Sequence, residues 1–496
     1  MWSYSKFEHN YTKSVFKHIE PLSDEFEVSV NGEKIPVYTC RISKYPFNTV
    51  WPGHQRAFEQ TETAAFVSLV SDQAITLEVT PKCEYGKIKI KPCSEGVKYA
   101  ESNGKITFEL SKNGQYVFEC DDYHHCLYIF NSKPILPPKP DEVTHYFGAG
   151  VHFPGKITLK SNDSVYIDKD ALVFGCIYAE NAKSIRIFGN GLIDDSGEER
   201  ISIHCYENYT NGNLKFYDCT DLKIEGILMR NSAIWCVNLF HCFNVRLDGI
   251  KIFGQWRYNT DGIDIVNSQD IAITNSFVHS FDDTITIKGI DRYADTDNRN
   301  IQVDGCVLWC DWGRCCEIGI ETACALYENI SFKNCDILRG GHVALDIQNG
   351  DYAEVRGVVF ESINVEYNAG DTLPVYQRSD AQEYTDQSTQ FVPRLISIDN
   401  RRFRTPENEK AWGVPHEAVK RLGGVRSISY KSINIFCDDE LLQSYSNPII
   451  KISIVSHEKE VEFKDITISD ISLNGHPADL TTADIELSGV NNLRIE

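Results

Sequence analysis

The stretch Asn259–Lys288, which reads NTDGIDIVNSQDIAITNSFVHSFDDTITIK, contains two short segments of one design. The first segment, DGIDI from Asp261, puts a carboxylate two residues before an alternating apolar pair. The second segment, DDTITI from Asp282, does the same with a doubled carboxylate. Alternation of apolar and polar residues is typical of a β-strand with one buried face. The stretch therefore predicts two strands of similar design, each preceded by acid.

If these segments are strands in successive coils of a helix of strands, their backbones lie ~4.8 Å apart. Asp261, Asp282 and Asp283 would then share one patch, and like charges that close cannot all be ordinary ionised acids. Such crowding is useful for general acid/base chemistry. The alternative is an acidic rim on a β-helix without catalytic activity.

The same strand pattern repeats along the chain. One ladder of apolar-x-apolar strands starts at Leu222, Val245, Ile271, Ile301, Ile330 and Val358. A second ladder is Val237-x-Leu239, Ile263-x-Ile265, Ile285-x-Ile287, Ile318-x-Ile320 and Leu345-x-Ile347. In this register, Cys316 and Val343 continue the positions of Asp261 and Asp283. Repeats of two or three strands with unequal loops predict a parallel β-helix.

The chain as a whole is expected to be all-β and to have two domains. Short alternating strands over residues 1–132 predict a β-sandwich, and a Pro-rich linker follows over 133–147. Residues 148–496 form the β-helix domain, with a long insertion at about 368–424 over the cleft. In the first domain, Trp51–Arg56 and Gln60–Glu62 form a polar, aromatic island. We favour a role in domain contact for this island over one in substrate binding.

Charge and composition limit the partners and the compartment. The net charge of −22 argues against nucleic acid, an anionic membrane surface or a polyanionic substrate as partner. No signal peptide or membrane-spanning run is evident in the sequence. Many of the 17 cysteines lie in apolar strand patterns, which favours free thiols and a cytoplasmic protein. Ligand spacing for a metal is lacking, no cofactor is expected, and homo-oligomerisation stays open.

The Asn259-Thr260-Asp261 and Asp282-Asp283 pair resembles the signature of polygalacturonase-like glycoside hydrolases, family 28. Dextranase and isopullulanase enzymes, family 49, form a related group with a similar carboxylate trio. The resemblance implies a right-handed parallel β-helix and hydrolysis of a glycosidic bond with inversion. It also implies that Asp282 is the general acid, while Asp261 and Asp283 hold and activate the water.

Two departures from the family pattern concern the substrate. Arg314 stands where the family has the histidine of a Gly-His-Gly segment, and Asp346-Ile347-Gln348 replaces the Arg-Ile-Lys that grips a substrate carboxylate. An acid in place of an arginine would repel a uronate. We therefore expect an α-linked neutral sugar to be cleaved from a short oligosaccharide. A galacturonide is the alternative, since Arg314 could hold a carboxylate from another side.

The residues expected to bind substrate lie on the coils around the acids. They are Asp264, Arg314, Glu317, Asp346, Gln348, Trp256, Tyr258 and Trp312. The polar members would bond sugar hydroxyls, and the aromatic members would offer apolar faces to sugar rings. Two other classes of function stay open: a carbohydrate-binding β-helix without catalysis, and a β-helix lyase, epimerase or transglycosylase.

Overall fold

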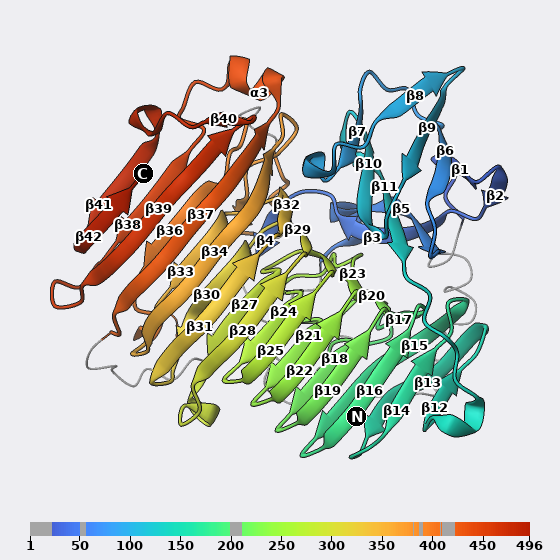
Figure 1. The fold of residues 1–496 in the computed structure, drawn as a ribbon, viewed down its shortest axis with the longest axis horizontal. Coiled ribbons are helices and arrows are strands. Elements are labelled where there is room, and N and C mark those ends of the chain that lie inside the picture. The colour runs from blue at the N-terminus through green and yellow to red at the C-terminus, as the bar shows by residue number, and fades with distance from the viewer. Residues whose placement is uncertain are drawn as a thin grey trace.

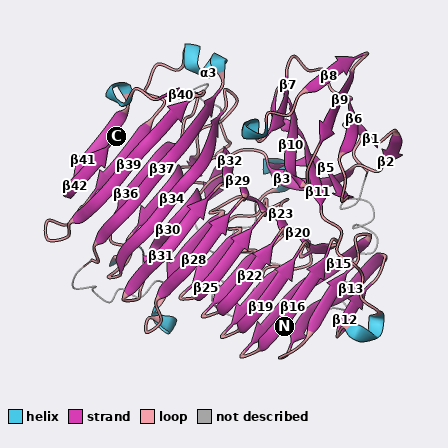
Figure 2. Cartoon of the chain, in the orientation of Figure 1, coloured by secondary structure: helices cyan, strands magenta, loops and turns pink. Residues whose placement is uncertain are grey.

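The computed structural model describes residues 22–49, 56–198, 211–379, 381–385, 390–406, 408 and 422–496. Residues 51–55 of the polar island, and most of the N-terminal segment searched for a signal peptide, lie outside these ranges. The described chain is almost entirely strand (Figure 2) and forms a β-sandwich beside a long parallel β-helix (Figure 1). No helix in the described ranges has the length and apolar character needed to cross a bilayer.

Two five-stranded sheets packed face to face form the N-terminal domain. The first contains β1 (Phe26–Val30), β2 (Glu33–Ile35), β6 (Ile75–Pro81), β8 (Tyr99–Ser102) and β9 (Lys105–Leu110). The second contains β3 (Tyr38–Ser43), β5 (Thr61–Val70), β7 (Ile88–Lys91), β10 (Gly114–Cys120) and β11 (Asp122–Ser132). Alternate residues such as Val28, Leu77, Phe118 and Ile129 fill the space between them, as the alternating pattern requires.

Thirty strands form the β-helix: 29 of them fall into three parallel sheets, and β40 (His476–Pro477) pairs antiparallel with the strand before it. Sheet 1 contains β12 (His145–Phe147), β14 (Ser164–Ile167), β16 (Lys183–Gly189), β19 (Thr220–Glu225), β22 (Phe243–Asp248), β25 (Gln269–Thr274), β28 (Asn298–Asp304), β31 (Leu326–Lys333), β34 (Glu354–Tyr367), β37 (Val425–Cys437), β39 (Phe463–Leu473) and β42 (Val490–Ile495). Sheet 2 contains β13 (Gly150–Leu159), β15 (Ala171–Glu180), β18 (Leu214–Tyr217), β21 (Val237–Phe240), β24 (Ile263–Val266), β27 (Ile285–Gly289), β30 (Arg314–Thr322), β33 (Val343–Gln348), β36 (Arg394–Asp399), β38 (Lys451–Val455) and β41 (Asp484–Ser488). Sheet 3 contains β17 (Leu192–Asp194), β20 (Leu228–Arg230), β23 (Lys251–Ile252), β26 (Phe277–Ser280), β29 (Val307–Cys310) and β32 (Asp336–Arg339).

Each coil stacks on the next with its apolar residues pointing inward. The predicted first ladder is confirmed, because Leu222, Val245, Ile271 and Ile301 are in register across successive strands of sheet 1. These side chains are almost completely buried, and each contributes ~1.5–3 kcal/mol by leaving water. The fold is therefore the parallel β-helix that the repeats predicted, right-handed as the family resemblance implied.

Short polar residues with left-handed backbones lie within the first half of several strands of sheet 1. Asn244, Asp270, Asn300 and Asn329 all have left-handed backbones with φ between 55° and 59°, a conformation that Asn and Asp tolerate best after glycine. The amide of Asn329 donates to Asn300 Oδ1 at 2.8 Å, and the amide of Asn300 donates to Asp270 Oδ1 at 2.8 Å. These side chains thus form a ladder of their own along one edge.

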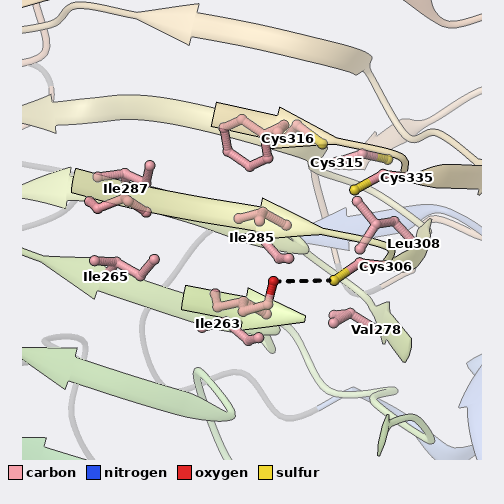
Figure 3. Close-up of a cluster of buried hydrophobic side chains, with 14 of the residues drawn as sticks. Ile263, Ile265, Val278, Ile285, Ile287, Cys306, Leu308, Cys315, Cys316 and Cys335 are labelled. Carbon is pink, nitrogen blue, oxygen red and sulfur yellow. Dashed lines mark hydrogen bonds between the residues drawn. The ribbon is translucent and has the colours of Figure 1, made fainter. Parts of the chain in front are cut away.

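The predicted register of the second ladder is wrong at one coil. Ile285 pairs with Cys316 and Ile287 with Ile318, so the inward pair is Cys316 and Ile318 rather than Ile318 and Ile320. Figure 3 shows Cys316 above Ile285 and Ile263 in the core. A buried thiol packs as a small hydrophobe. The chain turns at Gly319, where φ is +110° and an added Cβ would overlap the carbonyl of Gln348.

The insertion and the linker also differ from expectation. Strand β36 lies within the predicted insertion 368–424, yet it is a regular coil strand that pairs with β33 and β38. The predicted insertion is thus interrupted by a coil strand. In its first part, before β36, the strand β35 (Val375–Gln377) pairs with β4 (Phe47–Thr49) of the N-terminal domain. At the linker, β12 already belongs to the β-helix although it begins within 133–147.

The two domains share a buried, charged contact. Arg339 of β32 donates to Glu119 of β10 at 3.0 Å and also to Asp371. Lys91 of β7 lies 3.5 Å from Glu119 and 3.2 Å from Glu366 of β34. All five side chains have little or no exposure. An apolar cluster that includes Phe66, Tyr128, Phe253 and Phe277 lies beside them. The sandwich is therefore docked firmly on sheet 3.

Candidate active site

Register brings the predicted acids together on the outside of sheet 2. Ile263 pairs with Ile285 across β24 and β27, so Asp261 and Asp283 stand at equivalent positions one coil apart. The N–H of Gly262 donates to the carbonyl oxygen of Asp283 at 2.8 Å. The stacking expected from the sequence is therefore present.

Arg314 continues this line of residues one coil further along, since Thr284 N–H donates to its carbonyl oxygen at 2.8 Å. Its own N–H donates to Asp283 Oδ1 at 2.9 Å. The residue before it, Gly313, passes so close to the carboxylates of Asp282 and Asp283 that a Cβ there would overlap both. A glycine at this position is what allows the paired acids to lie against the next coil.

A lysine that the sequence analysis did not single out lies among the acids. Lys288 Nζ is 3.5 Å from Asp283, 3.7 Å from Asp261, and 3.8 Å from both Asp264 and Glu321. Burial opposes its charge, but these four carboxylates outweigh it and raise the pKa of Lys288 well above its usual value. The ammonium group therefore stays charged and partly balances the cluster.

The two neighbouring acids Asp282 and Asp283 have opposite tendencies. Burial raises the pKa of Asp282 to about 7, and the charge of Asp283 adds to the effect. Burial also acts to raise the pKa of Asp283, but the charges of Lys288 and Arg314 outweigh it and lower that pKa. Asp282 is partly exposed, whereas Asp283 is 6% exposed. Two carboxyls with separated pKa values suit an acid and a base.

Three other predicted acids form a buried floor rather than a surface for sugar. Asp264, Glu317 and Asp346 are at most 1% exposed. Burial is the main reason that the pKa of each is raised, most strongly for Asp264 and Glu317. Neither oxygen of Asp264 accepts a hydrogen bond from any residue that the structure describes. Its electrostatic partner is Lys288.

Arg314 and Gln348 both contact two of these buried acids, Asp346 and Glu317. Arg314 Nε lies 3.2 Å from Asp346 and 3.7 Å from Glu317. The amide of Gln348 donates to Asp346 at 2.8 Å and to Glu317 at 3.3 Å. Arg314 thus bonds acids of its own chain, as does Lys288.

Of the predicted aromatic residues, one borders the acids and two lie in the domain contact. Trp312 is partly exposed, and its ring lies 4.8 Å from His342 and 5.9 Å from Tyr376 between centroids. Trp256 and Tyr258 are 8% and 3% exposed. Trp256 donates to Asn231 at 3.0 Å and packs against Phe58.

The polar island reaches the same region through its described members. The Tyr258 hydroxyl donates to Gln60 Oε1 at 2.9 Å and lies 3.2 Å from Gln377 Oε1. The guanidinium of Arg56 lies over the rings of Tyr258 and Phe281, at 4.5 and 4.1 Å from their centroids. Tyr258 therefore joins the sandwich, the β-helix and the first insertion loop directly beside the acids.

Lys288, His342 and Tyr376 are the residues that sequence reasoning missed. Lys288 had a signal, since it is a charged residue on the outward side of the strand that follows the paired acids. His342 and Tyr376 had none, because coil stacking and the pairing of β35 with β4 bring them to Trp312. Both are partly exposed. Burial and the charge of Arg314 lower the pKa of His342 to about 4, so its imidazole is neutral.

Fold and site together define a parallel β-helix protein with a cluster of carboxylates on one sheet. The family model "Glycosyl hydrolases family 28" matches residues 141–393, slightly more than half of the chain. The chain belongs to this family, as the sequence signature predicted.

Known relatives are distant. "Probable exopolygalacturonase B" of Aspergillus fumigatus is 24% identical over 206 residues, which are 37% of this chain and 44% of that protein. "Probable rhamnogalacturonase A" of Aspergillus oryzae is 24% identical over 167 residues, 32% of this chain and 33% of that protein. This chain therefore spans less than half the length of these relatives. Among solved structures, Dex49A from Penicillium minioluteum has a TM-score of 0.55 at 12% identity, with 96% of this chain and 95% of that chain covered. That likeness concerns the fold.

Proposed function

We propose that the protein hydrolyses a glycosidic bond with inversion, using the carboxylates on sheet 2. Asp282 gives its proton to the leaving oxygen, while Asp283, with Asp261, binds and activates a water molecule. The observation that carries the proposal is the contrast between neighbouring acids. The pKa of Asp282 is raised to about 7, and that of Asp283 is lowered. A general acid must be protonated at working pH and its partner ionised.

We propose an α-linked neutral sugar in a short oligosaccharide as substrate. Six acids form the cluster: Asp261, Asp264, Asp282, Asp283, Glu317 and Asp346. Among the described residues, Lys288 and Arg314 are the cations that lie within 4.0 Å of these carboxylates. Both are therefore already paired with acids of the chain, and neither is free to bind the carboxylate of a uronate. The partly exposed rings of Trp312, His342 and Tyr376 suit the apolar face of a neutral sugar.

A galacturonide is the second candidate, and two observations favour it. Several relatives of this chain are named as polygalacturonases. In addition, Arg394 of β36 is exposed and stands two coils beyond Arg314 on the same line of residues. Its guanidinium could bind a carboxylate on the leaving-group side.

Turnover of matched neutral and galacturonide oligosaccharides separates the candidates. We expect higher kcat/KM on a neutral galactoside or glucoside, with little change in the variant Arg394→Ala. Preference for the galacturonide, lost in Arg394→Ala, would establish the second candidate. The anomeric proton of the first product, followed by NMR, tests inversion, and a retained configuration would contradict it. Sugar binding without turnover on any substrate would favour a binding β-helix.

A further inference from the structure

A second buried polar cluster lies toward the N-terminal end of sheet 2, away from the acids that the proposed mechanism uses. Cys176 of β15, and Asp195 and Glu198 of the turn after β17, each contribute one ligand atom, and these atoms all lie within 4.8 Å of one another. The three side chains are 1%, 0% and 4% exposed. The thiol and the carboxylates therefore meet in a space that is closed to solvent.

The hydrogen bonding of Asp195 is unlike that of its neighbour. Asp194 is also fully buried, and it accepts from Arg230 Nε at 2.5 Å, from Asn231 at 3.0 Å and from Ser196 N–H at 2.9 Å. Neither oxygen of Asp195 has a hydrogen-bond donor in the part of the chain that the structure describes. A buried carboxylate without donors is costly unless it is protonated or binds a cation.

Two further buried oxygens, Glu198 Oε2 and Asn211 Oδ1, also have no hydrogen-bond partner among the described residues. Asn211 is 7% exposed, and its Nδ2 and N–H donate to Glu198 Oε1 at 3.1 and 2.8 Å. Asn211 is thus held beside Glu198, and its side-chain carbonyl oxygen is buried without a donor. This observation is independent of the three titratable groups.

Arg257 does not neutralise Asp195 through a hydrogen bond. Its guanidinium donates to the carbonyl oxygens of Glu198 at 3.0 Å, Ser196 at 3.2 Å and Asn231 at 3.2 Å. The guanidinium therefore fixes the turn that carries Asp195 and Glu198, and it acts on the Asp195 carboxylate through its charge alone.

We propose that Cys176, Asp195, Glu198 and Asn211 bind one structural zinc ion. Zinc prefers four ligands and combines thiolate at ~2.3 Å with oxygen at ~2.0–2.2 Å. A hard cation such as Ca²⁺ or Mg²⁺ would not select a thiol. Four protein ligands with no open position are typical of a structural zinc site. The set contains one cysteine and no histidine, so the spacing of cysteines and histidines in the sequence did not indicate a metal.

The ion would support the candidate active site through one chain of contacts. Zinc fixes the turn at Glu198, whose carbonyl oxygen accepts from Arg257. The carbonyl oxygen of Arg257 accepts from the Thr260 hydroxyl at 2.7 Å, and Asp261 is the next residue. We therefore assign the zinc a positioning role rather than a part in the reaction.

Metal content of the full-length protein tests the proposal. Chelator-treated protein is titrated with Zn²⁺ in competition with a chromophoric chelator, and we expect one tight equivalent that raises Tm. Cys176→Ser and Asp195→Asn are each expected to weaken Zn²⁺ binding by at least ~100-fold and to abolish the rise in Tm. In wild type, free Zn²⁺ at 100 times its Kd would stabilise the folded state by ~2.7 kcal/mol. The control Cys236→Ser removes another fully buried thiol, two coils away, that donates to Asn213, and it should bind Zn²⁺ normally.

A spectroscopic test uses the wild-type protein alone, so it does not depend on whether any variant folds. Wild-type protein loaded with Co²⁺ should show thiolate-to-cobalt charge-transfer absorption, because Cys176 is the only cysteine in the proposed ligand set. Absence of bound Zn²⁺ and of this absorption would overturn the proposal and leave Asp195 as a carboxyl that shares a proton with Glu198. Normal Zn²⁺ binding by both ligand variants would also overturn it.

Discussion

Lys288 Nζ lies 3.5 Å from Oδ2 of Asp283, five residues earlier on the same coil. The lysine side chain is 5% exposed and touches three further carboxylates. It is therefore the main reason that Asp283 stays ionised beside Asp282, ahead of Arg314. This pair separates the two acids into different protonation states.

Lys288→Met tests that separation. Methionine keeps the apolar stem but removes the charge, so burial is opposed only by Arg314 and the pKa of Asp283 rises. We expect the acidic limb of the pH profile of kcat/KM to move to higher pH, with a loss of ~10²-fold at pH 6. The control Lys223→Met removes a lysine whose side chain is 56% exposed and should behave like wild type. An unchanged acidic limb in Lys288→Met would contradict the role.

The pKa of about 7 for Asp282 predicts the alkaline limit of activity. Because the acid must carry a proton, kcat/KM should fall as pH rises through about 7. Asp282→Asn should lose ~10²–10⁴-fold in turnover and keep sugar binding. Carboxyl ¹³C NMR of wild type and variant identifies the titrating group. Asp304→Asn, which alters an exposed carboxylate that accepts from Asn334 at 2.8 Å, is the matched control. Full turnover by Asp282→Asn would exclude Asp282 as the acid.

Asp264→Asn should stabilise the protein, and more so at neutral than at acidic pH. Burial raises the pKa of Asp264 well above the ordinary 3.8. Stability from its protonated form is present below that ordinary value and is lost as pH rises toward the folded value. Asparagine never ionises, so it avoids the loss. We expect a gain of ~1–2 kcal/mol at pH 7 and little change at pH 4, measured by urea unfolding. Destabilisation at pH 7 would contradict the expectation.

Arg339→Met should weaken the domain contact. Glu119 and Asp371 would lose their guanidinium partner while 0% and 9% exposed, and breaking one side of a buried ion pair costs ~3–5 kcal/mol. Differential scanning calorimetry should show a lower Tm, and limited proteolysis should show earlier cleavage near residues 133–147. Arg426→Met is the control, since the Arg426 side chain pairs with Glu354 and is 45% exposed. If Arg339→Met and Arg426→Met had the same Tm, the buried ion pairs of Arg339 would not stabilise the domain contact.

Local pattern was enough for the architecture. Strand alternation and the repeat of apolar pairs predicted the β-helix because every coil must bury the same inward positions. The signature at Asp261, Asp282 and Asp283 predicted the family. Its spacing could be recognised in the sequence because the acids stand one coil apart. The predicted register was wrong in β30. The sequence analysis chose Ile318 and Ile320 as the inward pair because both are plainly apolar, whereas the inward pair is Cys316 and Ile318.

The sequence by itself determined the solenoid, its family and the line of acids, because these depend on residues within one or two coils. Only the tertiary structure decided which acid keeps its proton, since that depends on burial and on Lys288 and Arg314 across neighbouring coils. It also decided that Tyr258 belongs to the domain contact and that Tyr376 reaches Trp312. Cys176, Asp195 and Asn211 likewise meet only in space. Electrostatics and long-range packing act between residues whose sequence separation carries no information about their distance.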